Sequence, residues 1–170
     1  MNSAIERILG WGACAVSLAL LVVALLLGTT ATAATGGATG PSVRQATVRL
    51  AAVPGRPSAG YFTLNGGTAG DTLTSVVSPL AERIEMHSSS MAGGVMRMDK
   101  LPAVKSMPGE TVRFAPGGNH LMIFGVAATV KPGATLPLTF RFASGAVVKV
   151  DATSVAAGAT MPMAMSHGGH

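Results

Sequence analysis

Short alternating segments, separated by glycine and proline turns, are the feature that most constrains what this chain can fold into. Between about Val43 and Val155, apolar and polar residues alternate in stretches such as "GYFTL" and "LPLTFRF". Pro-Gly pairs at 54–55, 108–109 and 132–133 interrupt them. Alternation with a period of two is typical of half-buried strands, and no segment here has a strong helical pattern. The sequence therefore predicts an all-β domain.

Nine segments are candidate strands, and they read ATVRL, AGYFTL, LTSVV, RIEMH, GVMRM, TVRF, HLMIFGV, LPLTFRF and AVVKV. The clearest hairpin joins the last two. Leu138 and Phe140 share one face, Ser144-Gly145 turns the chain, and Val148 and Val150 return. This number of short strands within about 110 residues indicates a β-sandwich or a Greek-key barrel.

Residues 1–34 are expected to be a signal peptide or a membrane anchor. Arg7 precedes a 21-residue uncharged segment, residues 8–28, and the small residues Ala31-Thr32-Ala33 follow it. We favour cleavage after Ala33 or Ala34, and an uncleaved anchor is the alternative because the segment can span a bilayer. Either version exports the rest of the chain. The expected location is the periplasm, with inner-membrane attachment only through an uncleaved leader.

The remaining chain divides by composition. Residues 35–43 are small and flexible, as in a linker, and residues 44–155 hold all the candidate strands. Residues 156–170 are rich in Met and His without a core-building pattern, which predicts a mobile tail.

The exported part contains no cysteine. The only one, Cys14, lies in the leader and precedes the apolar run instead of ending it, which disfavours a lipid anchor. Disulfides and thiolate ligands are therefore excluded from the domain, and any metal chemistry must use His, Met or carboxylates. The net charge of +5 comes from scattered basic residues without an aromatic platform, so nucleic acid is not an expected partner.

Histidine and methionine are concentrated in a few places. His120 and Met122 share one face of a strand, while Leu121 and Ile123 take the other. Met86 is expected to face away from His87 into the core. For Met91 and Met96, taken singly, the ordinary interpretation is that they fill gaps in the core.

Two imidazoles and two thioethers meet if the strands of His87, Met98 and His120–Met122 converge at one end of the sandwich. A single histidine on a strand is usually a half-buried side chain without a metal. The joint pattern, with cysteine absent and methionine beside each histidine, favours a metal site. Such a soft, neutral ligand set suits Cu(I) and suits Zn²⁺, Mg²⁺ or Ca²⁺ poorly.

The spacing of these four residues is His-x(10)-Met-x(21)-His-x-Met. It resembles the signature of the periplasmic PCu(A)C copper chaperones. The surrounding segments "GVMRM", "PGGNHLMIFG" and "GYFTLNGG" are also similar to that family. The resemblance covers roughly residues 44–152. One departure is "SSSMAGG" after His87, where members often have an acidic loop.

The resemblance implies a cupredoxin-like Greek-key β-sandwich that binds one Cu(I) through His87, Met98, His120 and Met122. It implies a metallochaperone, not an enzyme, that delivers copper to respiratory oxidase. The expected acceptor is the copper centre of cytochrome c oxidase subunit II or another cuproprotein, with Sco-type copper proteins as partners. The tail resembles the Met/His-rich extension of many members, which adds capacity for Cu(I) or Cu(II), here at Met161, Met163, Met165, His167 and His170.

Other functional classes compete with a copper chaperone. A periplasmic copper-buffering or resistance protein without a dedicated acceptor would carry the same site. An adhesion or interaction sandwich would bind no copper at all. A blue-copper electron carrier is disfavoured because it requires a cysteine thiolate. A copper oxygenase with an N-terminal histidine is disfavoured because no histidine lies near the leader's cleavage sites.

Overall fold

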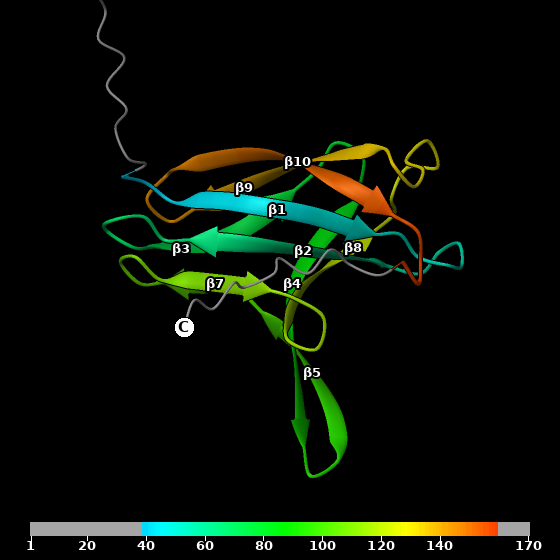
Figure 1. Ribbon diagram of the computed structural model, residues 1–170, viewed down its shortest axis with the longest axis horizontal. Coiled ribbons are helices and arrows are strands. Elements are labelled where there is room, and N and C mark those ends of the chain that lie inside the picture. The colour runs from blue at the N-terminus through cyan, green and yellow to red at the C-terminus, as the bar shows by residue number, and fades with distance from the viewer. Residues whose placement is uncertain (1–38, 160–170) are drawn as a thin grey trace, which may run out of the picture. The chain divides into compact units, whose positions relative to one another are not determined.

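Strands and turns make up the whole described part of the chain, residues 39–159 of the computed structural model (Figure 1). The predicted leader and most of the predicted tail lie outside these residues. The strands are β1 (Ser42–Arg49), β2 (Ser58–Asn65), β3 (Asp71–Val77), β4 (Arg83–Ala92), β5 (Val95–Leu101), β6 (Val104–Ser106), β7 (Thr111–Phe114), β8 (Asn119–Phe124), β9 (Thr135–Phe142) and β10 (Val147–Val155). Within this range no helix could span a membrane.

The all-β prediction is confirmed, with two differences in detail. The structure has a tenth strand, β6, whose three residues are too few to show an alternating pattern. Two residues of the predicted linker, Ser42 and Val43, belong to β1. The Leu138–Phe140 hairpin forms as expected, because Val148 pairs with Phe140 and Val150 with Leu138.

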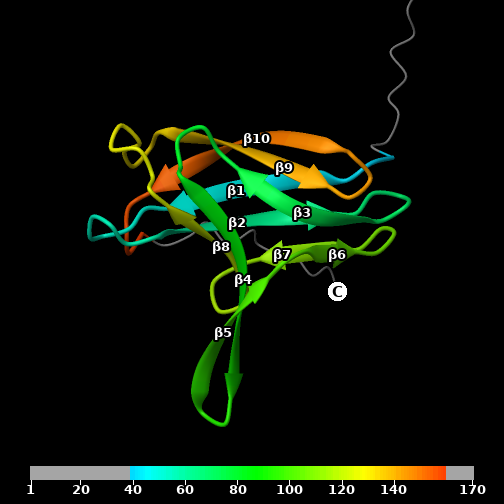
Figure 2. The ribbon, with the colours of Figure 1, turned by 180° about the vertical axis from the view of Figure 1, so that it is seen from behind.

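One continuous sheet has the strand order β5-β4-β8-β7-β2-β1-β10-β9-β3-β6 and curls back on itself (Figures 1 and 2). The β1–β10 and β7–β8 pairs are parallel and the remaining pairs are antiparallel. Phe62 of β2 stacks on Phe114 of β7, with ring centroids 4.1 Å apart. It also meets Phe140 of β9 edge-on at 4.9 Å, although β9 is three strands away in the sheet. The curled sheet therefore encloses one core, as in a sandwich.

The inner face of β8 supplies two fully buried core residues, Leu121 and Ile123. Because side chains alternate along a strand, His120 and Met122 lie on its other face. Met86 of β4 pairs with Leu121 and is buried beside it. The expected division of β8 and the core position of Met86 are both confirmed.

The outer half of the β4–β5 hairpin projects beyond the sandwich (Figures 1 and 2). Strand β8 pairs with β4 only from Arg83 to Ser88, so β4 beyond that point has only β5 as a strand partner. Met91 and Met96 lie on this two-stranded ribbon and are 66% and 64% exposed. The interpretation of these two methionines as core gap-fillers is therefore wrong, because no core lies beneath them.

Candidate metal centre

His87 and His120 are direct cross-strand neighbours. The register of β4 and β8 pairs them, and their ring centroids lie 6.1 Å apart with planes tilted by 30°. Thirty-three residues of sequence separate them, so only the antiparallel pairing of β4 and β8 brings them together. Both rings face away from the core, on the side opposite Met86 and Leu121.

Met98 and Met122 lie on the same face as the histidine pair. Met122 is opposite Glu85 on β4, and Met98 is opposite Ser89. Both methionines are thus diagonal neighbours of His87, Met98 on the β5 side and Met122 on the β8 side. Diagonal Cα atoms lie about 7–8 Å apart, within reach of long side chains. Met98 is about half exposed. The four predicted residues therefore share one face, with the imidazoles at its centre and one thioether on either side.

The ring of His120 is oriented by the loop that precedes β8. Its Nδ1 lies 3.0 Å from the carbonyl oxygen of Gly118. A carbonyl only accepts, so Nδ1 carries the proton and donates it. The lone pair of the neutral ring is then on Nε2, which leaves that nitrogen available to a metal ion.

The ring of His87 is oriented in the opposite sense. Its Nε2 lies 3.1 Å from Oε2 of Glu85, an acceptor-only carboxylate, so Nε2 donates and Nδ1 holds the lone pair. Nδ1 is buried and has no hydrogen-bond partner among the described residues. A buried polar atom without a partner is costly, and a metal ion would satisfy it. A metal-binding histidine typically donates its second ring nitrogen to a carboxylate or a carbonyl, as both rings do here.

Glu85, which accepts the hydrogen bond of His87, is not among the residues predicted from the sequence. Its carboxylate accepts a hydrogen bond from Lys100 at 2.9 Å, and it forms an ion pair with Arg83 at 3.2 Å. The hydrogen bond from Lys100, followed by that from His87, lowers the pKa of Glu85 to about 2. The carboxylate is therefore ionised and available to His87 throughout the neutral range. A local signal existed, because residue 85 must share a strand face with residue 87.

The chemistry of the face depends on sulfur. Among residues 39–159, no group of three or more His, Cys, Asp and Glu side chains is arranged to hold a metal ion. A site here must therefore combine the two imidazoles with the methionine thioethers, a set that prefers soft ions. The predicted tail ligands, Met161, Met163, Met165, His167 and His170, lie outside the described residues.

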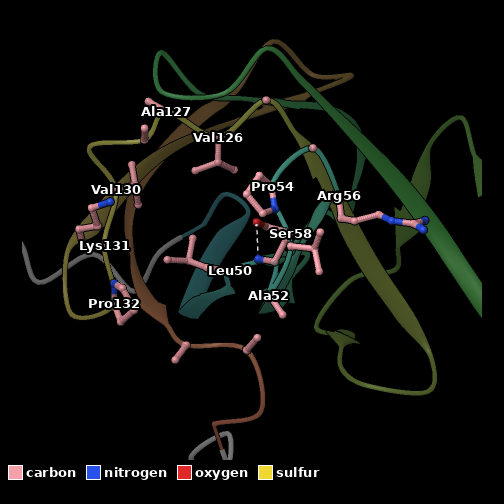
Figure 3. A pocket seen from close by; sticks show the side chains of 17 residues that line it. Leu50, Ala52, Pro54, Arg56, Ser58, Val126, Ala127, Val130, Lys131 and Pro132 are labelled. Atoms are coloured by element: carbon pink, nitrogen blue, oxygen red, sulfur yellow. Dashed lines mark hydrogen bonds between the residues drawn. The ribbon is translucent and has the colours of Figure 1, made fainter.

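A separate cavity of about 610 Å³ opens at another part of the domain (Figure 3). Loops 50–58 and 125–132 form most of its wall, which is largely Ala, Val, Pro and Leu with Arg56 and Lys131. No histidine or methionine is among the described residues that line it. The cavity is therefore no part of the His87–His120 face.

The sequence is similar to a known protein family and to a curated protein. Residues 42–154 match the LpqE-like family, described as "Putative lipoprotein LpqE-like". A curated protein of Leifsonia xyli subsp. xyli (strain CTCB07), named "Putative lipoprotein Lxx21020", is 31% identical over 142 residues. The match covers 78% of this chain and 85% of that protein.

Solved structures with the same fold include copper proteins. The "Copper-bound PCuAC domain from PmoF2" has a TM-score of 0.58 at 20% identity, covering 71% of this chain and 97% of that one. "Solution structure of apo-DR1885 from Deinococcus radiodurans" has a TM-score of 0.53 at 27% identity, covering 75% and 88%. The Cu(I) form, "CuI-DR1885", has a TM-score of 0.54 at 25% identity, covering 73% and 83%. The fold is therefore that of PCuAC domains.

Proposed function

The chain belongs to the LpqE-like family, and from that membership and the geometry of the β4–β5–β8 face we propose that it is an exported Cu(I) carrier. His87, Met98, His120 and Met122 bind the ion, and the protein passes it to another copper protein. The acceptor in this proposal is a respiratory oxidase, at the copper centre of subunit II. Sco-type proteins are the further partners.

One observation carries the proposal: Nδ1 of His87 is buried, lacks a hydrogen-bond partner among the described residues, and belongs to a ring paired with His120. Each ring donates its other nitrogen to an oxygen, as metal-bound histidines do. The Cu(I) named in the DR1885 structure supports the identity of the ion.

The ligand set suits transfer better than storage. Imidazole and thioether are neutral, so no ligand charge adds electrostatic affinity for the ion. A cysteine thiolate on an acceptor is a softer and stronger ligand for Cu(I), and it can replace the carrier's ligands one at a time. Copper keeps its oxidation state, and the acceptor thiol gives up its proton on binding. This is exchange without catalysis, so the protein is not an enzyme.

Export is part of the proposal. The predicted leader is followed by a cysteine-free domain, which suits an oxidising compartment. The family and the Leifsonia relative carry the name lipoprotein. For this chain we propose no lipid anchor, because cleavage after Ala33 or Ala34 would remove Cys14, its only cysteine.

The test is Cu(I) stoichiometry and copper X-ray absorption on the full chain, with His120→Ala and Met98→Leu variants. We expect a shell of nitrogen and sulfur that each of these variants disrupts. Met107→Leu is the matched control, since Met107 is also about half exposed but lies in the β6–β7 loop. A variant with Met161, Met163 and Met165 changed to Leu and both tail histidines changed to Ala should retain the shell.

A nitrogen and sulfur shell that persists in both His120→Ala and Met98→Leu would contradict binding at this face. Deleting the protein in its host separates a chaperone from a buffering protein. A chaperone's loss lowers copper loading of the oxidase under copper limitation, whereas a buffer's loss raises copper sensitivity.

A further inference from the structure

The tip of the β4–β5 hairpin carries a second pair of thioethers. Met91 lies directly opposite Met96, one residue pair before the turn. Gly93 and Gly94 make that turn with φ angles of 60° and 79°, as a tight two-residue hairpin requires. Directly opposite side chains in a sheet have Cβ atoms about 4.5–5.5 Å apart, a separation that two methionine side chains can bridge around one ion.

The pair continues the face of the His87 site. Because alternate residues share a face, Met96 lies on the same side as Met98, and Met91 on the same side as His87. The only other residue on this face of the ribbon is Ser89. By the same alternation, Arg97 and Asp99 lie on the opposite face. From the tip to Met98 this face thus carries no charged side chain. The first one along β5 is Lys100, which lies opposite His87 and donates its ammonium to Glu85.

Core packing does not explain these side chains. Met91 and Met96 are 66% and 64% exposed on a ribbon with no strand beneath it. Exposed thioethers of this kind are free to act as ligands, and sulfur without charge is selective for soft monovalent ions. The step to Met98 along β5 is two residues, about 7 Å, which two flexible side chains can span.

We propose that Met91 and Met96 form an outer Cu(I) site that receives the ion and hands it to Met98. The inference rests on the proposed function, in which His87, Met98, His120 and Met122 form the inner site. The outer site would give copper a path into and out of that inner site. Transfer is thioether exchange: Met98 sulfur binds as Met91 or Met96 sulfur leaves, and no electron or proton moves. Two neutral ligands hold the ion more weakly than the full inner set, so the inner site fills first.

The experiment is an anaerobic Cu(I) titration of the full chain, labelled with ¹³C at the methionine methyl groups and followed by NMR. Single Met→Leu variants assign the signals. We expect Met98 and Met122 to shift over the first equivalent, and Met91 and Met96 over the next. Met86, buried in the core, and Met107, exposed on a distant loop, are internal controls that should not move. Because each signal is assigned, copper bound by the tail methionines does not confuse the result.

The double variant Met91→Leu/Met96→Leu keeps the side-chain volume and removes both sulfurs. It should lose about one bound equivalent of Cu(I) while Met98 and Met122 still respond. Stationary Met91 and Met96 signals, with Met98 and Met122 shifting, would overturn the outer site and leave the proposed function intact. The reverse pattern would support a metal site at the tip and contradict the proposed inner site. If none of the four signals moves, both are wrong.

Discussion

His87 donates its Nε2 proton to Glu85 across 3.1 Å, and this single contact leaves the lone pair on Nδ1, which is buried without a hydrogen-bond partner among the described residues. A carboxylate behind the ring fixes its tautomer and raises the basicity of the other nitrogen. Glu85 is in turn held by Lys100 and Arg83, which keep it ionised. At the proposed copper site, these ion pairs would therefore raise metal affinity through the His87 ring.

Glu85→Gln should weaken Cu(I) binding by about 10- to 100-fold, the usual cost of losing a partner behind a metal ligand. The amide is nearly the same size but lacks the charge that orients and polarises the His87 ring. Competition against a colorimetric Cu(I) chelator measures the change. Glu82→Gln, an exposed residue just before β4, is the matched control. Equal affinities in the two variants would show that Glu85 does not act on the site.

Cu(I) affinity should decrease as the pH falls below about 6, because imidazole binds a metal only when deprotonated. Two histidines in the inner site make the decrease steeper than for one. Chelator competition across the pH range measures it. In a His87→Ala variant the slope should be shallower, and an affinity constant down to about pH 5 would contradict histidine ligation.

Leu121→Ala and Met122→Ala should separate stability from binding, because the two neighbours lie on opposite faces of β8. Leu121 is fully buried, so its truncation should lower the free energy of unfolding by about 2–5 kcal/mol. Met122 is only partly buried, and its truncation should cost less stability and more Cu(I) affinity. Denaturant unfolding and chelator competition on both variants provide the comparison. Similar profiles for the two would contradict the assignment of faces.

Ser144→Ala should destabilise the domain at neutral pH and much less in acid. The hydroxyl of Ser144 donates to Asp71, and this bond, with smaller contributions from the backbone amides of Thr72 and Ser144, lowers the pKa of Asp71. A lowered folded-state pKa stabilises the protein above the ordinary value of about 3.9, and that stabilisation disappears as the pH falls through the folded-state value.

Thermal unfolding at several pH values between about 2 and 7 measures this effect, since that window spans the titration of an aspartate. Ser90→Ala, a change at an exposed serine on β4, is the control. A melting-temperature difference that stays constant across the window would indicate that the Ser144 hydroxyl acts independently of the Asp71 charge.

Hydrogen peroxide should oxidise Met91, Met96 and Met98 well before Met86, because sulfoxide formation follows exposure. Bound Cu(I) should protect Met98 by occupying its sulfur. Peptide mass spectrometry of the treated apo and Cu(I)-loaded chains measures both effects. Identical Met98 oxidation in the two forms would argue against its role as a ligand.

Local pattern was enough to predict the fold class and the faces of β8, because alternation depends only on neighbouring residues. The positions of His120 and Met122 opposite Leu121 and Ile123 follow from it directly. The pairing of His87 with His120 and the position of Lys100 depend on strand register, which links residues far apart in the chain. Alternation therefore implied that Glu85 shares a face with His87, but not that Lys100 holds it.

Met91 and Met96 show the other limit of a local pattern. Their alternation is that of a strand with one buried face, yet β8 ends its pairing with β4 at Ser88 and leaves the ribbon unsupported. Burial depends on which strand lies alongside, and that strand is about thirty residues away in the chain. Sequence spacing alone could not indicate that these thioethers face solvent.

The β4–β5 ribbon, which has no further strand of the described chain beside it, should be less stable locally than the part of the sheet where β4 pairs with β8. His87, His120 and Met122 lie where β4 and β8 pair, on strands that also pack on the core, whereas Met98 lies on an edge strand whose pairing runs only to β4. A two-stranded ribbon is only marginally stable by itself, so its amide hydrogens should exchange with water far sooner than those of β8. In the proposed carrier, Met98 could then move away from the ion while His87, His120 and Met122 keep their positions, so copper release would not require unfolding of the sandwich.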